Sequence, residues 1–191
     1  MTSRPDNPAR LSPHDPAWAV RAQSRLDDVG RALAGLPGAD RAHFDHIGST
    51  AVADLDAKPI IDLQVRILPL PSEEELSLRL GAAGFRRAWG SRPDSPGVFR
   101  DIPRGDEPVP DEVWEKRLFV SDGGGVILHI RRADSPWGRA TVSFRDRLRA
   151  DPVARERYQQ LKRRLSVENA GKADYDDYTR AKTRFFDDLG A

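Results

Sequence analysis

Apolar residues near the start of the chain recur at helical spacing. They are Trp18, Ala22, Leu26, Val29 and Leu33. Intervals of three or four residues place side chains on one face of an α-helix. Asp15 followed by Pro16 is typical of a helix N-cap with proline in the first turn. An amphipathic helix is therefore predicted within residues 17–36, and the sequence GLPGAD ends it.

Two short apolar segments follow, and both predict strands. Residues 43–47 form the first, and a turn at Gly48-Ser49-Thr50 ends it. Residues 58–68, KPIIDLQVRIL, form the second, which is too apolar for the edge of a sheet and is expected in its interior. Asp62 is the one carboxylate within this second strand.

The middle of the chain alternates regular and irregular segments. Ser72 and Glu75 fit a capping box that begins a helix over 72–84, and the strand FRRAW follows. Residues 90–112 are rich in Pro, Gly and Asp, so we expect mainly a loop, with a short strand over 98–102 as a candidate. Residues 113–132 predict a hairpin around the turn DGGG.

The remaining chain predicts three helices. They span residues 136–151, 152–168 and 173–189. The order of elements favours an α+β (α/β-like) domain, with one mixed β-sheet packed against helices and a helical C-terminal third. We expect residues 1–14 to form a flexible arm and residues 15–191 to form this single domain.

The composition excludes several functional classes. The 191 residues carry a formal net charge of only +1, so no global field attracts nucleic acid or a membrane. Clustered arginines have acidic neighbours, which is typical of solvated helix faces. The chain has no cysteine, which excludes disulfides and thiolate sites. No secretory signal or membrane-spanning stretch is recognisable, and a cytoplasmic location is expected.

The Gly-Ser turn before the Asp62 strand suggests phosphate chemistry. Gly48 lets a ligand approach the backbone, while Ser49 and Thr50 offer hydroxyls and backbone N–H groups. Lys58 can offset phosphate charge, and Asp62 can hold a divalent ion that bridges phosphates. The alternatives are a purely structural turn and a salt bridge that satisfies Asp62.

Several separated motifs carry a family resemblance. The stretches HIGSTAVADLDAKPIIDLQV, LHIRRADSPWGRATVSFRDRLRADPVARERYQQLKRRL and YTRAKTRFF occur in that order within residues 15–186. They resemble the GrpB family, which also occurs as the C-terminal extension of some bacterial dephospho-CoA kinases. The resemblance implies a nucleotidyltransferase-like fold, in which a Gly-Ser turn precedes a strand bearing paired metal-binding carboxylates.

The chain departs from that pattern at one position. Asp62 matches the first carboxylate, but Gln64 stands where the second is expected, and the late strand offers His129 instead of a third aspartate. The resemblance therefore implies a weak metal site formed by Asp62, Gln64 and His129. Mg²⁺ and Zn²⁺ are the candidate cofactors, and we expect weak or absent Mg²⁺ binding by the free protein.

Two histidines occupy predicted strands within these motifs. If His46 and His129 converge on Asp62, the three residues are candidates for acid–base catalysis. The alternative is that each histidine is a satisfied core residue. We expect one cleft to collect both histidines together with Ser49, Lys58 and Asp62.

Further polar residues recur in the family-like segments and could line a pocket for an anion. The candidate ligand-binding residues are Gly48, Ser49, Thr50, Lys58, Arg117, Arg145, Lys162, Tyr178 and Lys182. Tyr178 and Lys182 are four residues apart and share a helix face. An ordinary solvated helix face is the alternative.

The sequence thus supports two main functional hypotheses, and a different reaction on the same scaffold that uses the histidines is a third. The first is a domain that binds a nucleotide or another phosphorylated or anionic small molecule and catalyses a transfer reaction. The second is a non-catalytic module that binds a protein partner or assists its folding, as the kinase extension suggests. No Gly-x-x-x-x-Gly-Lys-Ser/Thr pattern occurs in the chain, so kinase activity is not expected from it.

Overall fold

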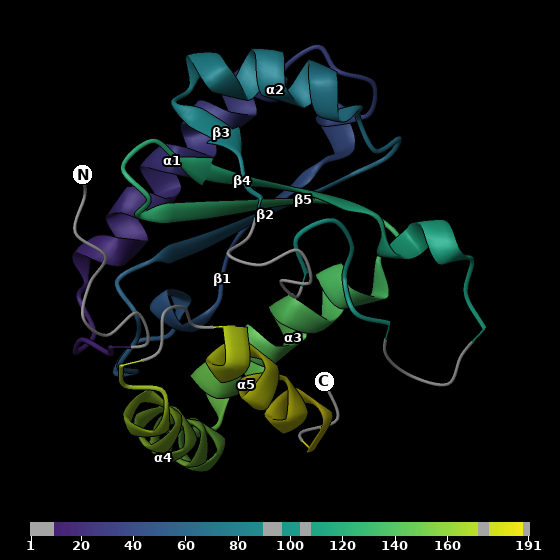
Figure 1. Ribbon diagram of the computed structural model, residues 1–191. Coiled ribbons are helices and arrows are strands. Elements are labelled where there is room, and N and C mark those ends of the chain that lie inside the picture. Colours follow the sequence, from purple (N-terminus) through teal and green to yellow (C-terminus); the bar gives the residue numbers. More distant parts are fainter. Residues whose placement is uncertain (1–9, 90–96, 104–107, 172–175, 189–191) are drawn as a thin grey trace.

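A mixed sheet with helices on both faces forms the protein (Figure 1). The computed structural model describes residues 10–89, 97–103, 108–171 and 176–188. The strands of this part of the chain are β1 (His43–Ile47), β2 (Ile61–Ile67), β3 (Phe85–Arg87), β4 (Lys116–Ser121) and β5 (Val126–Arg132). Their spatial order is β1-β2-β5-β4-β3, with β2 and β5 parallel and the other neighbours antiparallel. The predicted α+β fold and the interior position of the Asp62 strand are confirmed.

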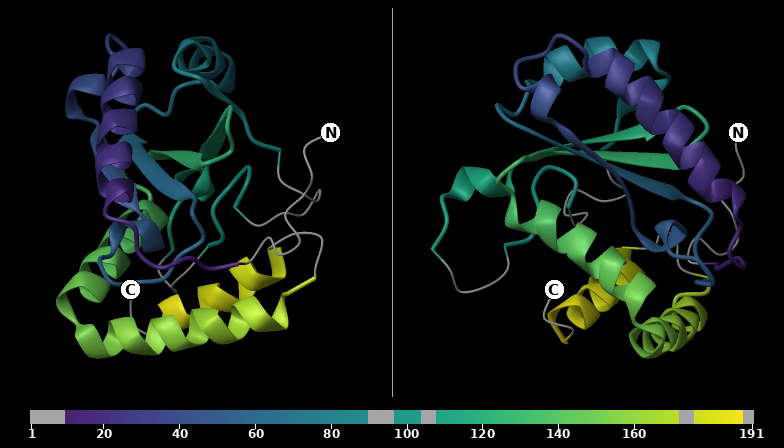
Figure 2. Two further views of the ribbon diagram at one scale, coloured as in Figure 1. Left: turned by 90° about the vertical axis from the view of Figure 1, so that its left-hand side faces the viewer. Right: turned by 180° about the vertical axis from the view of Figure 1, so that it is seen from behind.

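One face of the sheet carries the main hydrophobic core. Helices α1 (Ala17–Leu33) and α2 (Glu73–Ala82) cover this face, as both views of Figure 2 show. All five apolar positions that predicted the first helix are buried in α1. From the sheet, alternate residues of β2 and β5, such as Leu63 and Leu128, pack against them without exposure. Each fully buried side chain of this size contributes about 1.5–3 kcal/mol of hydrophobic stabilisation.

The sequence signals at the helix ends operate as expected. The Ser72 hydroxyl accepts a hydrogen bond from the Glu75 backbone N–H at 3.1 Å and so caps α2. Gly84 follows that helix with φ +74°, a left-handed conformation that favours glycine. The Asp15 carboxylate accepts from the Ala17 N–H at 2.9 Å, at the start of α1.

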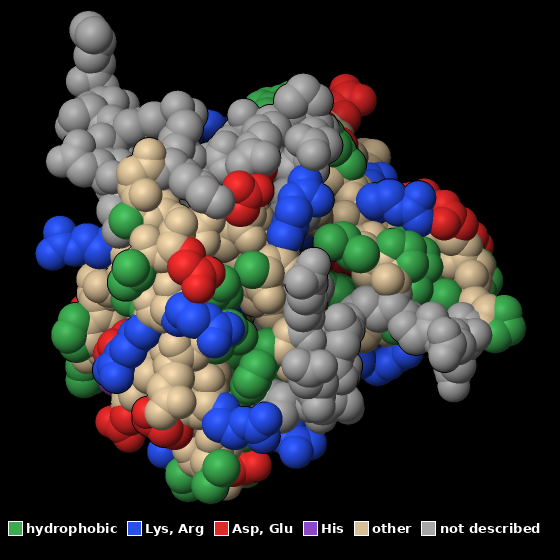
Figure 3. Space-filling view, turned by 60° about the horizontal axis from the view of Figure 1, so that its bottom comes forward, with side chains coloured by type: hydrophobic (Ala, Val, Ile, Leu, Met, Phe, Trp, Pro, Cys, Tyr) green, Lys and Arg blue, Asp and Glu red, His purple; other side chains and the backbone are tan. Residues whose placement is uncertain are grey.

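The other face of the sheet is approached by the three C-terminal helices. These are α3 (Pro136–Ala150), α4 (Pro152–Glu168) and α5 (Asp176–Asp188). Their contacts are largely aromatic: the ring centroids of Phe144 and Tyr158 lie 5.1 Å apart, and Tyr158 stacks on Phe185 at 5.2 Å. Figure 3 shows this side of the molecule, where basic and acidic side chains are interspersed as expected for solvated helix faces.

Two expectations about irregular segments were wrong. Residues 98–102 form no strand of the sheet, because only an isolated bridge joins Arg100 to Glu115. Val113 and Trp114 belong to a 3-10 turn, η3 (Asp111–Trp114), so the hairpin begins later, at Lys116. The rest of the predicted 90–112 loop includes residues 90–96 and 104–107, which lie outside the described residues.

The predicted N-terminal arm is only partly described. Residues 1–9 lie outside the described residues. Ser12, within the predicted arm, pairs with Ala57 through two backbone hydrogen bonds of 2.8 and 2.9 Å. The folded chain therefore includes residues before Asp15. Among the described helices, none combines the length and the apolar character needed to cross a bilayer.

Candidate functional site

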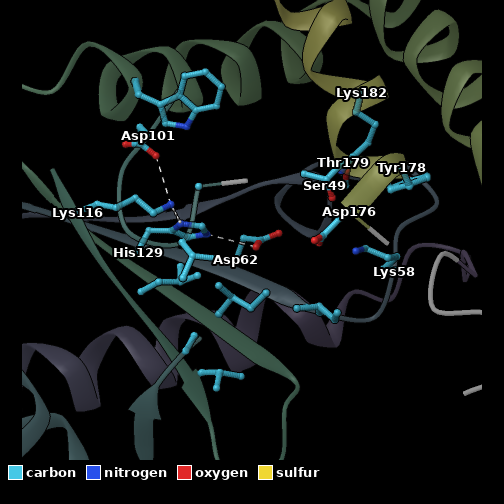
Figure 4. Close-up of a pocket in the computed structure, with 18 of the residues that line it drawn as sticks. Ser49, Lys58, Asp62, Asp101, Lys116, His129, Asp176, Tyr178, Thr179 and Lys182 are labelled. Atoms are coloured by element: carbon cyan, nitrogen blue, oxygen red, sulfur yellow. Dashed lines mark hydrogen bonds and ion pairs between the residues drawn. The ribbon is translucent and has the colours of Figure 1, made fainter. Parts of the chain in front are cut away.

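A cavity of about 510 Å³ lies beside the face of the sheet that α1 and α2 do not cover (Figure 4). Strands β2, β3, β4 and β5 form one wall, while η2 (Ser49–Ala51), residues 57–60, residues 97–102 and the helices α3, α4 and α5 contribute to the others. This volume is typical of small-molecule sites. Its polar and charged lining residues are Ser49, Thr50, Lys58, Asp62, Arg86, Asp101, Lys116, His129, Arg131, Lys162, Asp176, Tyr178, Thr179 and Lys182.

Gly48 and Asp62 are placed against each other, as the sequence suggested. Ile47 pairs with Asp62, so the turn after β1 passes directly over the carboxylate. Gly48 has φ +71° and ψ −172°, a region that is essentially restricted to glycine. A Cβ at this position would lie 2.6 Å from Oδ2 of Asp62. The glycine therefore gives the carboxylate its position at the cavity.

Asp62 has His129 as its neighbour on the adjacent strand. The parallel pairing aligns Gln64 with His129, and Nε2 of His129 lies 3.6 Å from Oδ1 of Asp62. Burial acts to raise the pKa of Asp62, but the imidazole of His129 and the ammonium groups of Lys182 and Lys58 hold it below its usual value. Asp62 is therefore ionised at neutral pH.

The other nitrogen of His129 meets a buried lysine. Nζ of Lys116 lies 3.1 Å from Nδ1 of His129. Burial, together with the charges of Lys116 and Arg131, lowers the pKa of His129 to about 4, so the ring is neutral at pH 7. Burial lowers the pKa of Lys116 to about 8, against the opposing effect of Asp101, and this lysine remains mostly protonated. An ammonium group only donates, so Nδ1 accepts and the ring proton is on Nε2, facing Asp62.

Asp101 anchors this arrangement from the irregular segment 97–103. Its carboxylate accepts two hydrogen bonds from Arg131, at 2.6 and 3.0 Å, and lies 3.3 Å from Nζ of Lys116. The three side chains are at most 2% exposed. Although burial acts to raise the pKa of Asp101, the charges of Arg131 and Lys116 lower it to about 2. The carboxylate is thus a permanent counter-charge to two buried cations.

Three further lysines gather at the other end of the cavity, around tyrosine rings. The ammonium groups of Lys58 and Lys182 lie 5.5 and 4.7 Å from the centroid of Tyr178, and Lys162 lies 5.4 Å from that of Tyr158. Lys162 also donates to the backbone oxygen of Asp56. Burial lowers the pKa of all three lysines, and that of Lys58, which Lys182 lowers further, reaches about 7.

Most of the predicted site residues line this cavity. Among the catalytic candidates these are Asp62 and His129, and among the ligand-binding candidates they are Ser49, Thr50, Lys58, Lys162, Tyr178 and Lys182. Gly48 lies behind Asp62 and supports it. The roles of these residues stay predictions, but their expected proximity is present.

His46 does not join them, contrary to the expectation of a single cleft. It pairs with Leu63, whose side chain packs into the α1–α2 core, so the two histidines project from opposite faces of the sheet. Nε2 of His46 lies 3.0 Å from Oγ1 of Thr50. Burial lowers its pKa to about 4. The structure therefore places His46 as a support for the turn, away from the cavity.

Gln64 was predicted as a weak metal ligand, and its surroundings do not fit that role. Its amide oxygen accepts hydrogen bonds from Arg131 at 2.8 Å and Thr141 at 3.1 Å, and its Nε2 donates to the Gly138 oxygen at 3.0 Å. The side chain is fully buried. These hydrogen bonds link β2 to α3. Because both lone pairs of the amide oxygen accept hydrogen bonds, none is left to bind an ion.

Two predicted cationic residues also lie outside the cavity lining. Arg117 alternates with the cavity-facing residues of β4, donates to the Lys116 backbone oxygen and lies 3.7 Å from Glu115. Arg145 on α3 donates to the His46 oxygen at 2.9 Å and thereby braces the end of β1. Arg117 is outside the cavity because side chains alternate along a strand. Arg145 is outside it because its guanidinium is used in a structural hydrogen bond.

For a metal ion, the cavity offers few ligands. Within the described part of the chain, no group of three or more His, Asp or Glu side chains could hold an ion. Asp62 is the carboxylate that faces the space, because Nδ1 of His129 accepts from Lys116 and its Nε2 carries a proton, and the positive charges of Lys58, Lys116 and Lys182 lie nearby. Any ion bound here would need its remaining ligands from a ligand's phosphate oxygens and from water.

The unit formed by Asp101, Lys116 and Arg131 was not predicted from the sequence. One available signal was the use of lysine: the chain has only 5 lysines against 26 arginines, and 4 of the 5 line this cavity. A buried lysine can lose its proton, whereas an arginine remains charged. In an arginine-rich chain, the few lysines therefore indicate positions where a cation that can lose its proton is required.

Replacement of Gly48 should disrupt the site and the fold together. We expect Gly48→Ala to lower the free energy of unfolding by about 1–3 kcal/mol, because of its backbone conformation, and by more if the Cβ displaces Asp62. Urea denaturation measures this change. Gly81→Ala in α2 is the matched control, since its Cβ meets nothing within 4 Å, and it should be neutral or stabilising. Equal stability of the two variants would contradict this account of Gly48.

Loss of the Asp101 charge should leave two buried cations uncompensated. Asp101→Asn is expected to destabilise the protein by about 3–5 kcal/mol in urea denaturation. The control is Asp111→Asn, which breaks the exposed ion pair with Arg100 and should cost less than about 1 kcal/mol. A small effect at Asp101 would show that the segment 97–103 is held by other contacts.

Lys58 should destabilise the unliganded protein at neutral pH. Its pKa is about 7 in the folded chain and about 10.5 when unfolded, so between these values the unfolded chain binds more protons and stability rises with pH. We expect Lys58→Met to be more stable than wild type at pH 7, with an advantage that shrinks towards pH 10. In the control Arg21→Met, which replaces an exposed cation, the difference in stability from wild type should stay constant across this pH range. If the difference in unfolding free energy between Lys58→Met and wild type stayed constant across this pH range, the lowered pKa of Lys58 would be refuted.

The comparisons with known proteins agree with this architecture. Residues 8–191 match the family model described as GrpB protein. A dephospho-CoA kinase of Mycolicibacterium paratuberculosis is 34% identical over 188 residues, which cover 95% of this chain but 45% of the kinase. The chain thus spans less than half the length of that relative. The glutamate-rich protein GrpB of Alkalihalophilus pseudofirmus is 29% identical, with 94% of this chain and 92% of that protein covered.

A solved structure shows the same fold. The crystal structure of the conserved protein GrpB from Enterococcus faecalis superposes with a TM-score of 0.65 at 20% identity, and it covers 95% of this chain and 100% of that one. At this identity the likeness concerns the fold alone. The family model, by contrast, matches nearly the whole chain, and the protein therefore belongs to the GrpB family.

Proposed function

We propose that the cavity binds a phosphorylated or otherwise anionic small molecule, a nucleotide being the leading candidate. The observation that carries this proposal is the gathering of four of the chain's five lysines around one cavity. Lys58 and Lys182 form the anion-binding end together with the turn at Ser49. Ammonium groups are effective point-charge partners for phosphate.

The charges of the cavity favour an anion over a free cation. Among the described lining residues, six side chains are Lys or Arg and three are Asp. One of the three, Asp101, is already paired with Arg131 and Lys116. An incoming anion would stabilise the protonated form of Lys58 and raise its lowered pKa, so binding is coupled to proton uptake near neutral pH.

The pair formed by Asp62 and His129 suggests how a transfer reaction could proceed. Asp62 is ionised, and the neutral His129 directs its Nε2 proton towards it. In this arrangement Asp62 is the candidate base or metal ligand, and His129 orients it. Phosphoryl-type transfer would require a divalent ion, most of whose ligands come from the substrate. Mg²⁺ should therefore bind with the ligand rather than before it.

A non-catalytic role as a protein-binding module is the second candidate. It is favoured by the match to less than half of a longer dephospho-CoA kinase, in which the same kind of domain accompanies other sequence. Such a module would not need a cavity of ionisable side chains. Loss of partner binding on surface substitution, together with no small-molecule ligand, would support this alternative.

Isothermal calorimetry with nucleoside phosphates, coenzyme A precursors and pyrophosphate, with and without Mg²⁺, tests the first proposal. We expect binding that weakens about tenfold or more in Lys58→Met and again in Lys182→Met, because each loses a charge-assisted contact. Arg163→Met removes an exposed cation of α4 and should leave affinity unchanged. Equal affinity in all three variants, or no binding across the panel, would overturn the proposal.

A further inference from the structure

Three aliphatic side chains form a second, apolar part of the same cavity. Val120 pairs with Ile127, and Leu118 pairs with His129, so all three lie on the face of the sheet that carries Asp62. They line the cavity and are only half-buried. Among the described residues, none of the three belongs to the hydrophobic clusters that hold the helices to the sheet.

This apolar floor is continuous with the charged end of the site. Ile127 is the pairing neighbour of Asp62 on β2, and Leu118 is that of His129. Figure 4 shows Lys58, Tyr178 and Lys182 on the opposite side of Asp62 from His129 and Lys116. The Asp62–His129 pair therefore adjoins both the anion-binding end and the floor. A ligand that contacts both the lysines and the floor must itself have an anionic group and an apolar group.

We propose that the ligand is an organic phosphate whose apolar ring or chain lies on the floor formed by Leu118, Val120 and Ile127. This inference rests on the proposed function, since the phosphate is held by Lys58 and Lys182. The floor side chains carry no hydrogen-bonding atoms, so they recognise the body of the ligand by apolar contact and do not read polar edges. For roughly every 50–60 Å² of apolar surface that the ligand and the floor bury together, binding becomes about tenfold tighter.

Calorimetry with inorganic phosphate, phenyl phosphate and adenosine monophosphate separates the two parts of recognition. We expect phenyl phosphate and adenosine monophosphate to bind about tenfold or more tightly than inorganic phosphate. Leu118→Asn should remove most of this advantage and leave the affinity for inorganic phosphate unchanged. Val120→Thr, which is nearly isosteric, should reduce the advantage in the same direction with little risk to folding.

The control is Leu78→Asn, which changes a leucine that is 80% exposed on α2, the helix on the opposite face of the sheet. It should leave all three affinities unchanged. Equal binding of all three phosphates by wild type would overturn the apolar subsite while leaving the anion-binding proposal intact. Loss of inorganic phosphate binding in Val120→Thr would also overturn it, since the floor would then act only through the fold. Binding of none of the three would remove both proposals.

Discussion

The parallel pairing of β2 with β5 is the constraint on which both the core and the site depend. Because side chains alternate along a strand, this one register assigns Leu63 and Leu128 to one face and Asp62 and His129 to the other. The first pair enters the core under α1 and α2, and the second enters the cavity. A slip of one residue would exchange the two sets and place charges in the core. Folding stability and site geometry are therefore selected by the same hydrogen bonds.

The charged residues of the site are tolerated because they occur as compensated groups. Asp101 neutralises much of the positive charge of Arg131 and Lys116, and burial together with the charges of these two cations lowers the pKa of His129 and keeps its ring neutral. Such buried ion pairs add little net stability, but loss of one partner is costly. The segment 97–103 is thus fixed to the sheet by a carboxylate rather than by strand pairing. This explains how an irregular stretch can form a wall of the cavity.

The sequence predicted the elements better than the partners of individual side chains. The apolar period of α1 and the caps at Asp15 and Ser72 are local signals, and the structure has all of them. The placement of Asp62 beside Gly48 followed from the motif. His46 was wrongly placed because its face depends on the register between β1 and β2, which no local signal specifies. Gln64 was misjudged because its hydrogen-bond partners come from β5 and α3, distant in sequence.

Asp101 could not be predicted from the sequence for a different reason. Its own segment has no periodicity, and its importance arises from two cations on strands that follow it in the chain. Only the unusual distribution of lysine pointed towards this region. Lysine is the cation whose charge a buried site can switch off, whereas an arginine such as Arg131 stays charged in its ion pair with Asp101. A domain whose only purpose was a stable interface would gain nothing from enclosing lysines at the expense of their hydration. Their enclosure is consistent with a site that is electrostatically incomplete until an anion enters it, and in which ligand binding and protonation stabilise the same state.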